Sequence, residues 1–195
     1  MKNLTITFLT IVFCLTSSIA FSETVKPEFL KERNGIIYKK KVTNKPYSGY
    51  VEGKKENGFL VRGTYQNGKK EGIWKTYDWD VQLWTKKTFK DGKLDGVSEI
   101  YYDNGRLENK VNYKNGKMNG LSEFYDDKGQ LRFLETWKNG KQDGVWEEYH
   151  ENGQLRIKVP YKDGKKAGVE EEYYDNGQIE EKITYKNGEI INVDF

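Results

Sequence analysis

GVSEIYYDNGRLENKVNYKNGKMN, residues 96–119, is one copy of a 24-residue unit that recurs along this chain. Apolar and polar residues alternate at period two through 97–102 and again through 107–113, which is typical of half-buried strands. Asp-Asn-Gly at 103–105 separates them, and a three-residue loop with glycine third is a standard hairpin connection. The unit is therefore predicted to be a β-hairpin.

The same template residues return every 24 positions. The glycines are Gly72, Gly96, Gly120, Gly144 and Gly168 in one column and Gly105, Gly129, Gly153 and Gly177 in another. The tyrosines are Tyr77, Tyr101, Tyr125, Tyr149 and Tyr173. Self-similarity at a fixed period is the signature of repeat architectures. The chain is predicted to be all-β, a single-layer antiparallel β-meander of about twelve strands built from tandem 24-residue β-hairpin repeats.

The hairpin loop also predicts a register. A three-residue loop pairs Tyr101 with Leu107 and Val97 with Val111, which places tyrosines and aliphatic residues on one face. We expect this to be the inward face in every unit, because 24 is even. Residues 114–120, with two glycines, are expected to connect to the next strand.

The N-terminus has the pattern of a secretory signal. Residues 4–15 form an uncharged apolar run after Lys2, and small residues follow. Cleavage is expected after Ala20 or Ser22, with a retained membrane anchor as the alternative. Export follows, to the periplasm, the outer envelope or the outside of the cell.

The domain organisation follows from the leader and the repeat limits. We expect a signal peptide over 1–22, a lead-in with an N-terminal cap half repeat over 23–48, six repeats over 49–191 and a C-terminal cap over 192–195. Ile190, Ile191, Val193 and Phe195 are expected to cover the last open edge of the sheet.

Composition excludes several function classes. Lys+Arg 33 against Asp+Glu 30 gives a net charge of +3 with interspersed signs, so nucleic acid is not an expected partner. One cysteine and one histidine make a zinc cluster improbable. The sequence predicts no metal, no cofactor and no catalytic residues.

Two sets of residues are candidates for binding. Glu99, Glu123, Glu147 and Glu171 form a column on the predicted inward face. Neighbouring carboxylates would lie about 10 Å apart, too far to share one metal ion. Two interpretations remain: a ladder for cations or basic peptides, or carboxylates that pair with lysine and backbone groups.

The second set interrupts the polar pattern of the other face. It comprises Trp74, Trp84, Ile100, Phe124 and Trp146, with Leu134 beside them. A single-layer sheet leaves one face open, so these residues are either an exposed partner-binding stripe or a surface covered by the lead-in. His150 lies on this face and is expected to be solvated.

The pattern G-x-x-x-x-Y-x-x-x-G-x-L followed by Y-x-x-G-K-x-x-G resembles the MORN-repeat variant of bacterial exported proteins. This chain carries it as GVSEIYYDNGRL…YKNGKMNG at 96–120, GLSEFYDDKGQL…WKNGKQDG at 120–144 and GVWEEYHENGQL…YKDGKKAG at 144–168. Related bacterial chains are often labelled antitoxin-like. Eukaryotic MORN arrays occur in membrane-junction proteins and before some phosphatidylinositol-phosphate kinase domains.

The resemblance implies a scaffold, since repeats of one kind serve many functions. A lipid-kinase label could reach the chain through its repeats, but it has no glycine-rich phosphate loop with its lysine, no HRD and no DFG. We expect an exported, non-catalytic protein-interaction module that is monomeric and binds a protein partner. A peripheral module for membrane or phosphoinositide surfaces ranks below it, because lysines alternate with acids along the sequence.

Overall fold

The computed structural model describes residues 24–41 and 44–195, and the expected signal peptide lies outside them. One 3₁₀ turn, η1 (Pro27–Phe29), precedes the strands. The strands are β1 (Leu30–Arg33), β2 (Ile36–Lys39), β3 (Gly49–Lys54), β4 (Leu60–Gln66), β5 (Lys69–Tyr77), β6 (Leu83–Lys90), β7 (Lys93–Tyr101), β8 (Leu107–Lys114), β9 (Lys117–Tyr125), β10 (Leu131–Lys138), β11 (Lys141–Tyr149), β12 (Leu155–Lys162), β13 (Lys165–Lys166), β14 (Gly168–Tyr173), β15 (Ile179–Lys186) and β16 (Glu189–Asp194). No helix in these ranges is long and apolar enough to cross a membrane.

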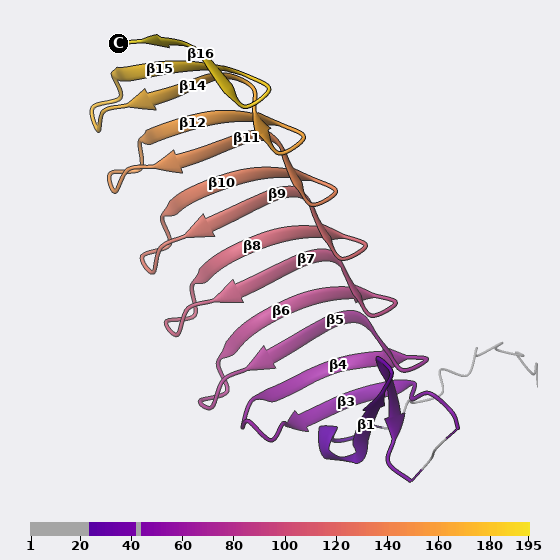
Figure 1. Ribbon diagram of the computed structural model, residues 1–195. Coiled ribbons are helices and arrows are strands. Elements are labelled where there is room, and N and C mark those ends of the chain that lie inside the picture. The colour runs from indigo at the N-terminus through magenta and orange to yellow at the C-terminus, as the bar shows by residue number, and fades with distance from the viewer. Residues whose placement is uncertain (1–23, 42–43) are drawn as a thin grey trace, which may run out of the picture.

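Strands β3 to β16 form one 14-stranded sheet in chain order (Figure 1). Strands pair antiparallel with their neighbours in sequence, except that β12 pairs with both the short β13 and β14, and the sheet does not close on itself. This confirms the open meander of tandem hairpins. The order follows from the short connections, because strands joined by tight turns can pair only with their sequence neighbours.

The three-residue loop is confirmed at one edge of the sheet. The backbone N–H of Tyr102 donates to the carbonyl of Arg106 at 2.9 Å, and that of Gly105 donates to the carbonyl of Tyr102 at 2.8 Å. Gly105 has a φ of 78°, the left-handed conformation this loop needs at its third position.

The connection at the other edge differs from the expected one. Asn115 and Gly116 form a two-residue turn with φ of 50° and 80°, and Lys114 pairs with Lys117 across it. Gly120 lies inside β9 at a φ of 105°, so the expected connection over 114–120 is wrong. Asn-Gly between alternating strands is a strong hairpin signal, and it was present in the sequence.

The register beyond the loop also differs. Tyr101 pairs with Leu107 as expected, but Val97 pairs with Asn112, whereas Val111 pairs with Ser98. A β-bulge between Ile100 and Tyr101 shifts the register by one residue. A shift of one residue moves a strand's side chains to the opposite face, so Val97 and Val111 lie on different sides of the sheet.

The residues on each face of the sheet therefore differ from those expected. The aromatic face carries Trp74, Ser98, Ile100, Val111, Ser122, Phe124, Phe133, Trp146 and Val159. The tyrosine–glutamate face carries the tyrosine and glutamate columns with Ile73, Val97, Leu121 and Val169. The buried side chains of the sheet lie on the aromatic face: Val51, Val61, Trp74, Thr85, Ser98, Val111, Ser122, Val159 and Glu170. The expectation that the tyrosine face is the inward one is wrong.

The lead-in packs against the first repeat. Strands β1 and β2 form a separate hairpin, and Ile37 donates its N–H to the carbonyl of Gly68 at 2.9 Å. Val25 donates to the carbonyl of Tyr50 at 2.9 Å and is buried. A Cβ on Gly53 would lie 2.9 Å from Pro27 Cδ, so this glycine, which fits no repeat turn, allows the close approach of the lead-in.

Strand β16 is the closing strand of the sheet, as expected. It pairs with β15, and its apolar side chains remain exposed: Ile190 is 59% exposed, Ile191 61% and Phe195, just beyond the strand, 100%. These residues extend the sheet by one strand without covering its outer edge.

Replacing Gly129 by valine should lower the free energy of unfolding by about 1–3 kcal/mol. Gly129 has a φ of 86°, which a β-branched residue adopts only with strain, and the site is otherwise open, with Arg106 Cδ 3.8 Å from a Cβ there. Urea unfolding measures the effect. Lys128→Val, in the same exposed loop, is the control and should change stability by less than about 0.5 kcal/mol. Equal losses in both variants would contradict the conformational explanation.

Candidate functional site

An aromatic cluster occupies the middle of the aromatic face. Phe133 on β10 pairs with Phe124 on β9, and its ring centroid lies 6.1 Å from that of Trp146 on β11. Phe133 is 37% exposed. Leu134 was expected on this face, but it pairs with Glu123 and Glu147 on the other one. Phe133 was missed because the bulge moved the register of its strand.

Trp74 is buried, with 6% of its surface exposed. Its Nε1 donates to the carbonyl of Thr64 at 3.1 Å, and its ring makes an edge contact with Tyr65 at 4.8 Å between centroids. A Cβ on Gly63 would lie 2.3 Å from the indole ring, so the ring fills the space over that glycine. The hypothesis that Trp74 belongs to an exposed stripe is wrong, because Trp74 is part of the core of the first repeats.

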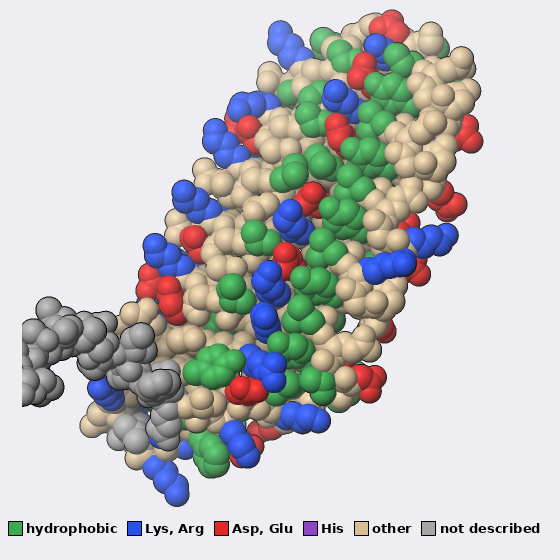
Figure 2. Space-filling view, turned by 180° about the vertical axis from the view of Figure 1, so that it is seen from behind, with side chains coloured by type: hydrophobic (Ala, Val, Ile, Leu, Met, Phe, Trp, Pro, Cys, Tyr) green, Lys and Arg blue, Asp and Glu red, His purple; other side chains and the backbone are tan. Residues whose placement is uncertain are grey.

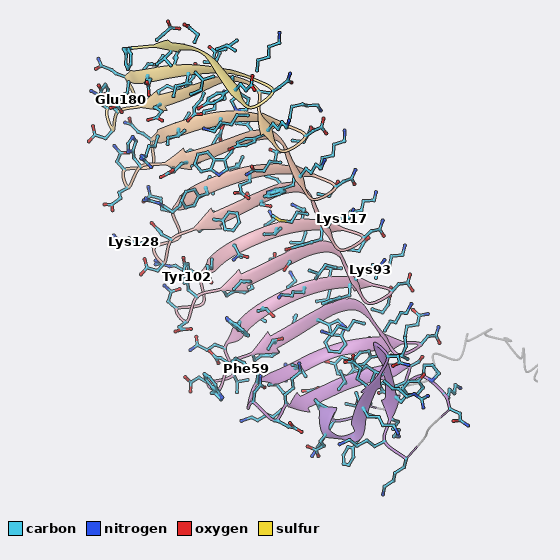
Figure 3. The ribbon with its side chains drawn as sticks, in the orientation of Figure 1. Phe59, Lys93, Tyr102, Lys117, Lys128 and Glu180 are labelled. Atoms are coloured by element: carbon cyan, nitrogen blue, oxygen red, sulfur yellow. The ribbon has the colours of Figure 1, made fainter. Side chains whose placement is uncertain are left out.

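Trp84 remains exposed and belongs to a separate cluster. It is 43% exposed and stacks on Phe59, with 5.0 Å between ring centroids. Phe59 lies at the loop edge near the N-terminal end of the sheet (Figure 3). Trp84 and Ile100 both line a cavity of about 330 Å³ beside this stack. The sequence therefore placed Trp84 and Ile100 near one another, without indicating a cavity.

The carboxylate column carries lysine and tyrosine partners. Lys86 Nζ lies 2.8 Å from Glu99 Oε2, and the Tyr101 hydroxyl donates to the same carboxylate at 3.0 Å. Corresponding pairs join Lys110 to Glu123 at 2.9 Å and Lys182 to Glu171 at 3.1 Å. Figure 2 shows basic and acidic side chains alternating along this face, bordered by hydrophobic ones. The geometry favours paired carboxylates over an open ladder, and no cluster of potential metal ligands occurs among the described residues.

These contacts predict an alkaline transition. Burial, followed by the neighbouring carboxylate, raises the pKa of Tyr101 and of Tyr149 to about 12. A group whose pKa is higher in the folded state stabilises the fold below its unfolded pKa of about 10 and loses that contribution as pH rises toward 12. The melting temperature should therefore fall as the pH rises from 10 to 12. In Tyr101→Phe/Tyr149→Phe this fall should be smaller, and an unchanged profile would contradict the assignment.

Lysines gather along the edge formed by the Asn-Gly and Asp-Gly turns. They are exposed, and they are Lys69, Lys90, Lys93, Lys114, Lys117, Lys138, Lys141, Lys162, Lys165 and Lys186. Lys93 and Lys117 point outward along this edge (Figure 3). Some nearby acids are engaged within the fold: Asp95 accepts the backbone N–H of Asn115 at 2.9 Å. Asp143 pairs with Lys162 at 2.9 Å on the same edge, so the edge is rich in lysine but also carries acids.

His150 connects two repeats. A ring nitrogen of His150 lies 2.8 Å from the carbonyl oxygen of Tyr173. Tyr102 occupies the equivalent position two repeats earlier, and its hydroxyl donates to the carbonyl of Tyr125 at 2.7 Å. The expectation that His150 is simply solvated is wrong. The contact of His150 with the next repeat gives it a structural role.

Comparison with known families identifies the repeat. The family model described as MORN repeat variant matches residues 94–115, 118–139, 142–163 and 166–187. These are four tandem repeats, and the hairpins of the same sheet begin earlier, at Gly49. A search of curated proteins gives no match.

Proposed function

The chain carries tandem MORN-variant repeats, and from this premise we propose that it is an exported, non-catalytic scaffold that binds a protein partner through its aromatic face. MORN-variant repeats are generally interaction modules without catalytic residues of their own. The observation that carries the proposal is the partly exposed cluster of Phe124, Phe133 and Trp146 in the middle of that face. Tryptophan and phenylalanine are enriched in protein interfaces, and large apolar groups on an open sheet face are typical of binding surfaces.

The test is partner capture with variants on opposite faces. Phe133→Ser/Trp146→Ser should lose most partner binding in a pull-down from envelope extract, because truncated aromatic anchors usually account for much of the binding energy. Leu121→Ser/Val169→Ser is the matched control on the tyrosine–glutamate face, where these residues are 38% and 42% exposed. It should retain binding. Equal capture by both variants would place the interface elsewhere.

Export is proposed from the apolar run at 4–15 and the small residues after it. Blotting of cytoplasmic, envelope and secreted fractions tests it, with N-terminal sequencing to identify cleavage after Ala20 or Ser22. Recovery of the full-length chain only from the cytoplasm would contradict this part of the proposal.

The lysine edge supports a second candidate function, association with an anionic membrane surface. Lysines near such a surface contribute about 1 kcal/mol each at moderate salt. Sedimentation with phosphatidylserine vesicles that falls as salt rises would favour this function, and no sedimentation at low salt would exclude it.

A further inference from the structure

Two lysines occupy equivalent places four repeats apart on the aromatic face. Near the C-terminus, Lys166 forms an ion pair with Glu170, and its Nζ lies 3.4 Å from the Tyr185 hydroxyl and 4.8 Å from the centroid of that ring. Glu170 is 5% exposed, so its carboxylate is removed from water and held by this lysine. The site shows how this fold holds a carboxylate.

At the N-terminal end, the same place lacks its carboxylate. Lys70 is equivalent to Lys166, while Trp74 stands where Glu170 does and Phe89 stands where Tyr185 does. The ammonium of Lys70 lies 4.8 Å from the centroid of the Trp74 ring and 4.7 Å from that of Phe89. No ion pair joins Lys70 to an acid in the part of the chain that the structure describes.

The surroundings of Lys70 are cationic and apolar. Lys55 and Lys87 line the same cavity of about 330 Å³, and no Asp or Glu among the described residues does. Lys87 is itself an exception, since the equivalent positions hold Val111, Glu135, Val159 and Ile183. Burial, then the charges of Lys55 and Lys87, lowers the pKa of Lys70. A half-buried cation beside two others is costly unless an anion joins it.

The remaining walls of the cavity are apolar. They include Phe59, Val61, Trp84 and Ile100. Binding pockets of this kind combine apolar walls with a few convergent polar groups. The volume is enough for one aromatic or short alkyl group with its carboxylate.

We propose that this cavity binds a carboxylate carried on an apolar body. The carboxylate pairs with Lys70 as Glu170 pairs with Lys166, and the apolar body packs against Phe59 and Trp84. A small free acid and an acidic side chain of a partner beside an apolar residue share this chemistry. The inference does not rest on the proposed function, because the cavity lies at Phe59 and Trp84, away from the Phe133–Trp146 cluster.

The test titrates the full chain with 3-phenylpropionate and follows binding by calorimetry. Saturable binding is expected, and it should be at least about tenfold weaker for the neutral 3-phenylpropanamide, which lacks the charge, and for acetate, which lacks the ring. Lys70→Met should lose at least tenfold in affinity. Lys93→Met removes the same charge from the exposed edge and should bind as the wild type does. Equal binding of acid and amide, or full binding by Lys70→Met, overturns the proposal.

Two further measurements complete the design. Lys70→Arg should bind nearly as well as wild type, and circular dichroism confirms that the Lys70 variants are folded, so that a loss reports the cavity. Competition of 3-phenylpropionate with partner capture indicates an acidic side chain of the partner as the natural ligand, and capture unaffected by the probe indicates a free acid. Absence of probe binding to the folded wild type overturns the site and leaves the proposal for the Phe133–Trp146 cluster standing.

Discussion

Trp74→Ala is expected to lower the free energy of unfolding by about 3–5 kcal/mol, the range for truncating a buried aromatic residue. The indole is 6% exposed, fills the space over Gly63 and contacts the rings of Tyr65 and Phe89. Its Nε1 also donates to the carbonyl of Thr64, which would lose that partner. Because repeats stabilise one another through nearest neighbours, the loss should appear first in β4, β5 and β6. Urea unfolding and hydrogen exchange of these strands measure it.

Trp84→Ala is the matched control. Trp84 is 43% exposed and stacks on Phe59 at the edge of the sheet, so its removal should cost about 1 kcal/mol or less. If Trp74→Ala and Trp84→Ala destabilise equally, Trp74 is not the core residue that its burial indicates.

Lys166→Met is expected to lower the free energy of unfolding by about 2 kcal/mol. Removing one partner of a fully buried ion pair costs about 3–5 kcal/mol because it leaves an uncompensated charge. Here the Glu170 side chain is 7% exposed and that of Lys166 is 32% exposed, so solvent screens part of the effect. Thermal unfolding at neutral pH measures the loss.

Lys70→Met at the equivalent place should have the opposite effect. It removes a half-buried ammonium that has no carboxylate partner among the described residues, so stability should be unchanged or raised by up to about 1 kcal/mol. If both variants lower the free energy of unfolding by about 2 kcal/mol, an anionic group already pairs with Lys70 in the free protein.

The repeat and the strand content were predictable from local information. A glycine or tyrosine that returns every 24 residues, with period-two alternation between, is compatible only with a tandem array of hairpins. The loop at 103–105 was predictable for the same reason, because its third residue must be a glycine in the left-handed conformation.

Which residues lie on which face of the sheet was not predictable, because it depends on the strand register, and local sequence rules leave that register open. No residue in the sequence marks the bulge beside Tyr101, but the bulge reverses the side of the sheet on which Val111 lies. Phe133 and Leu134 exchanged roles for the same reason. Of the aromatic residues expected to form one stripe, Trp74 is part of the core and the others are partly exposed.

The sequence by itself determined the repeat, the hairpins and the order of strands, since all three arise from contacts between neighbours in the chain. Only the tertiary structure decided which face is buried, which lysines share an edge and which cavity holds Lys70. These features join residues one or several repeats apart, and they depend on bulges and on the stacking of whole units. Lys70 and Lys166 are equivalent residues of one array, yet they have different partners because Trp74 stands in place of the carboxylate of Glu170.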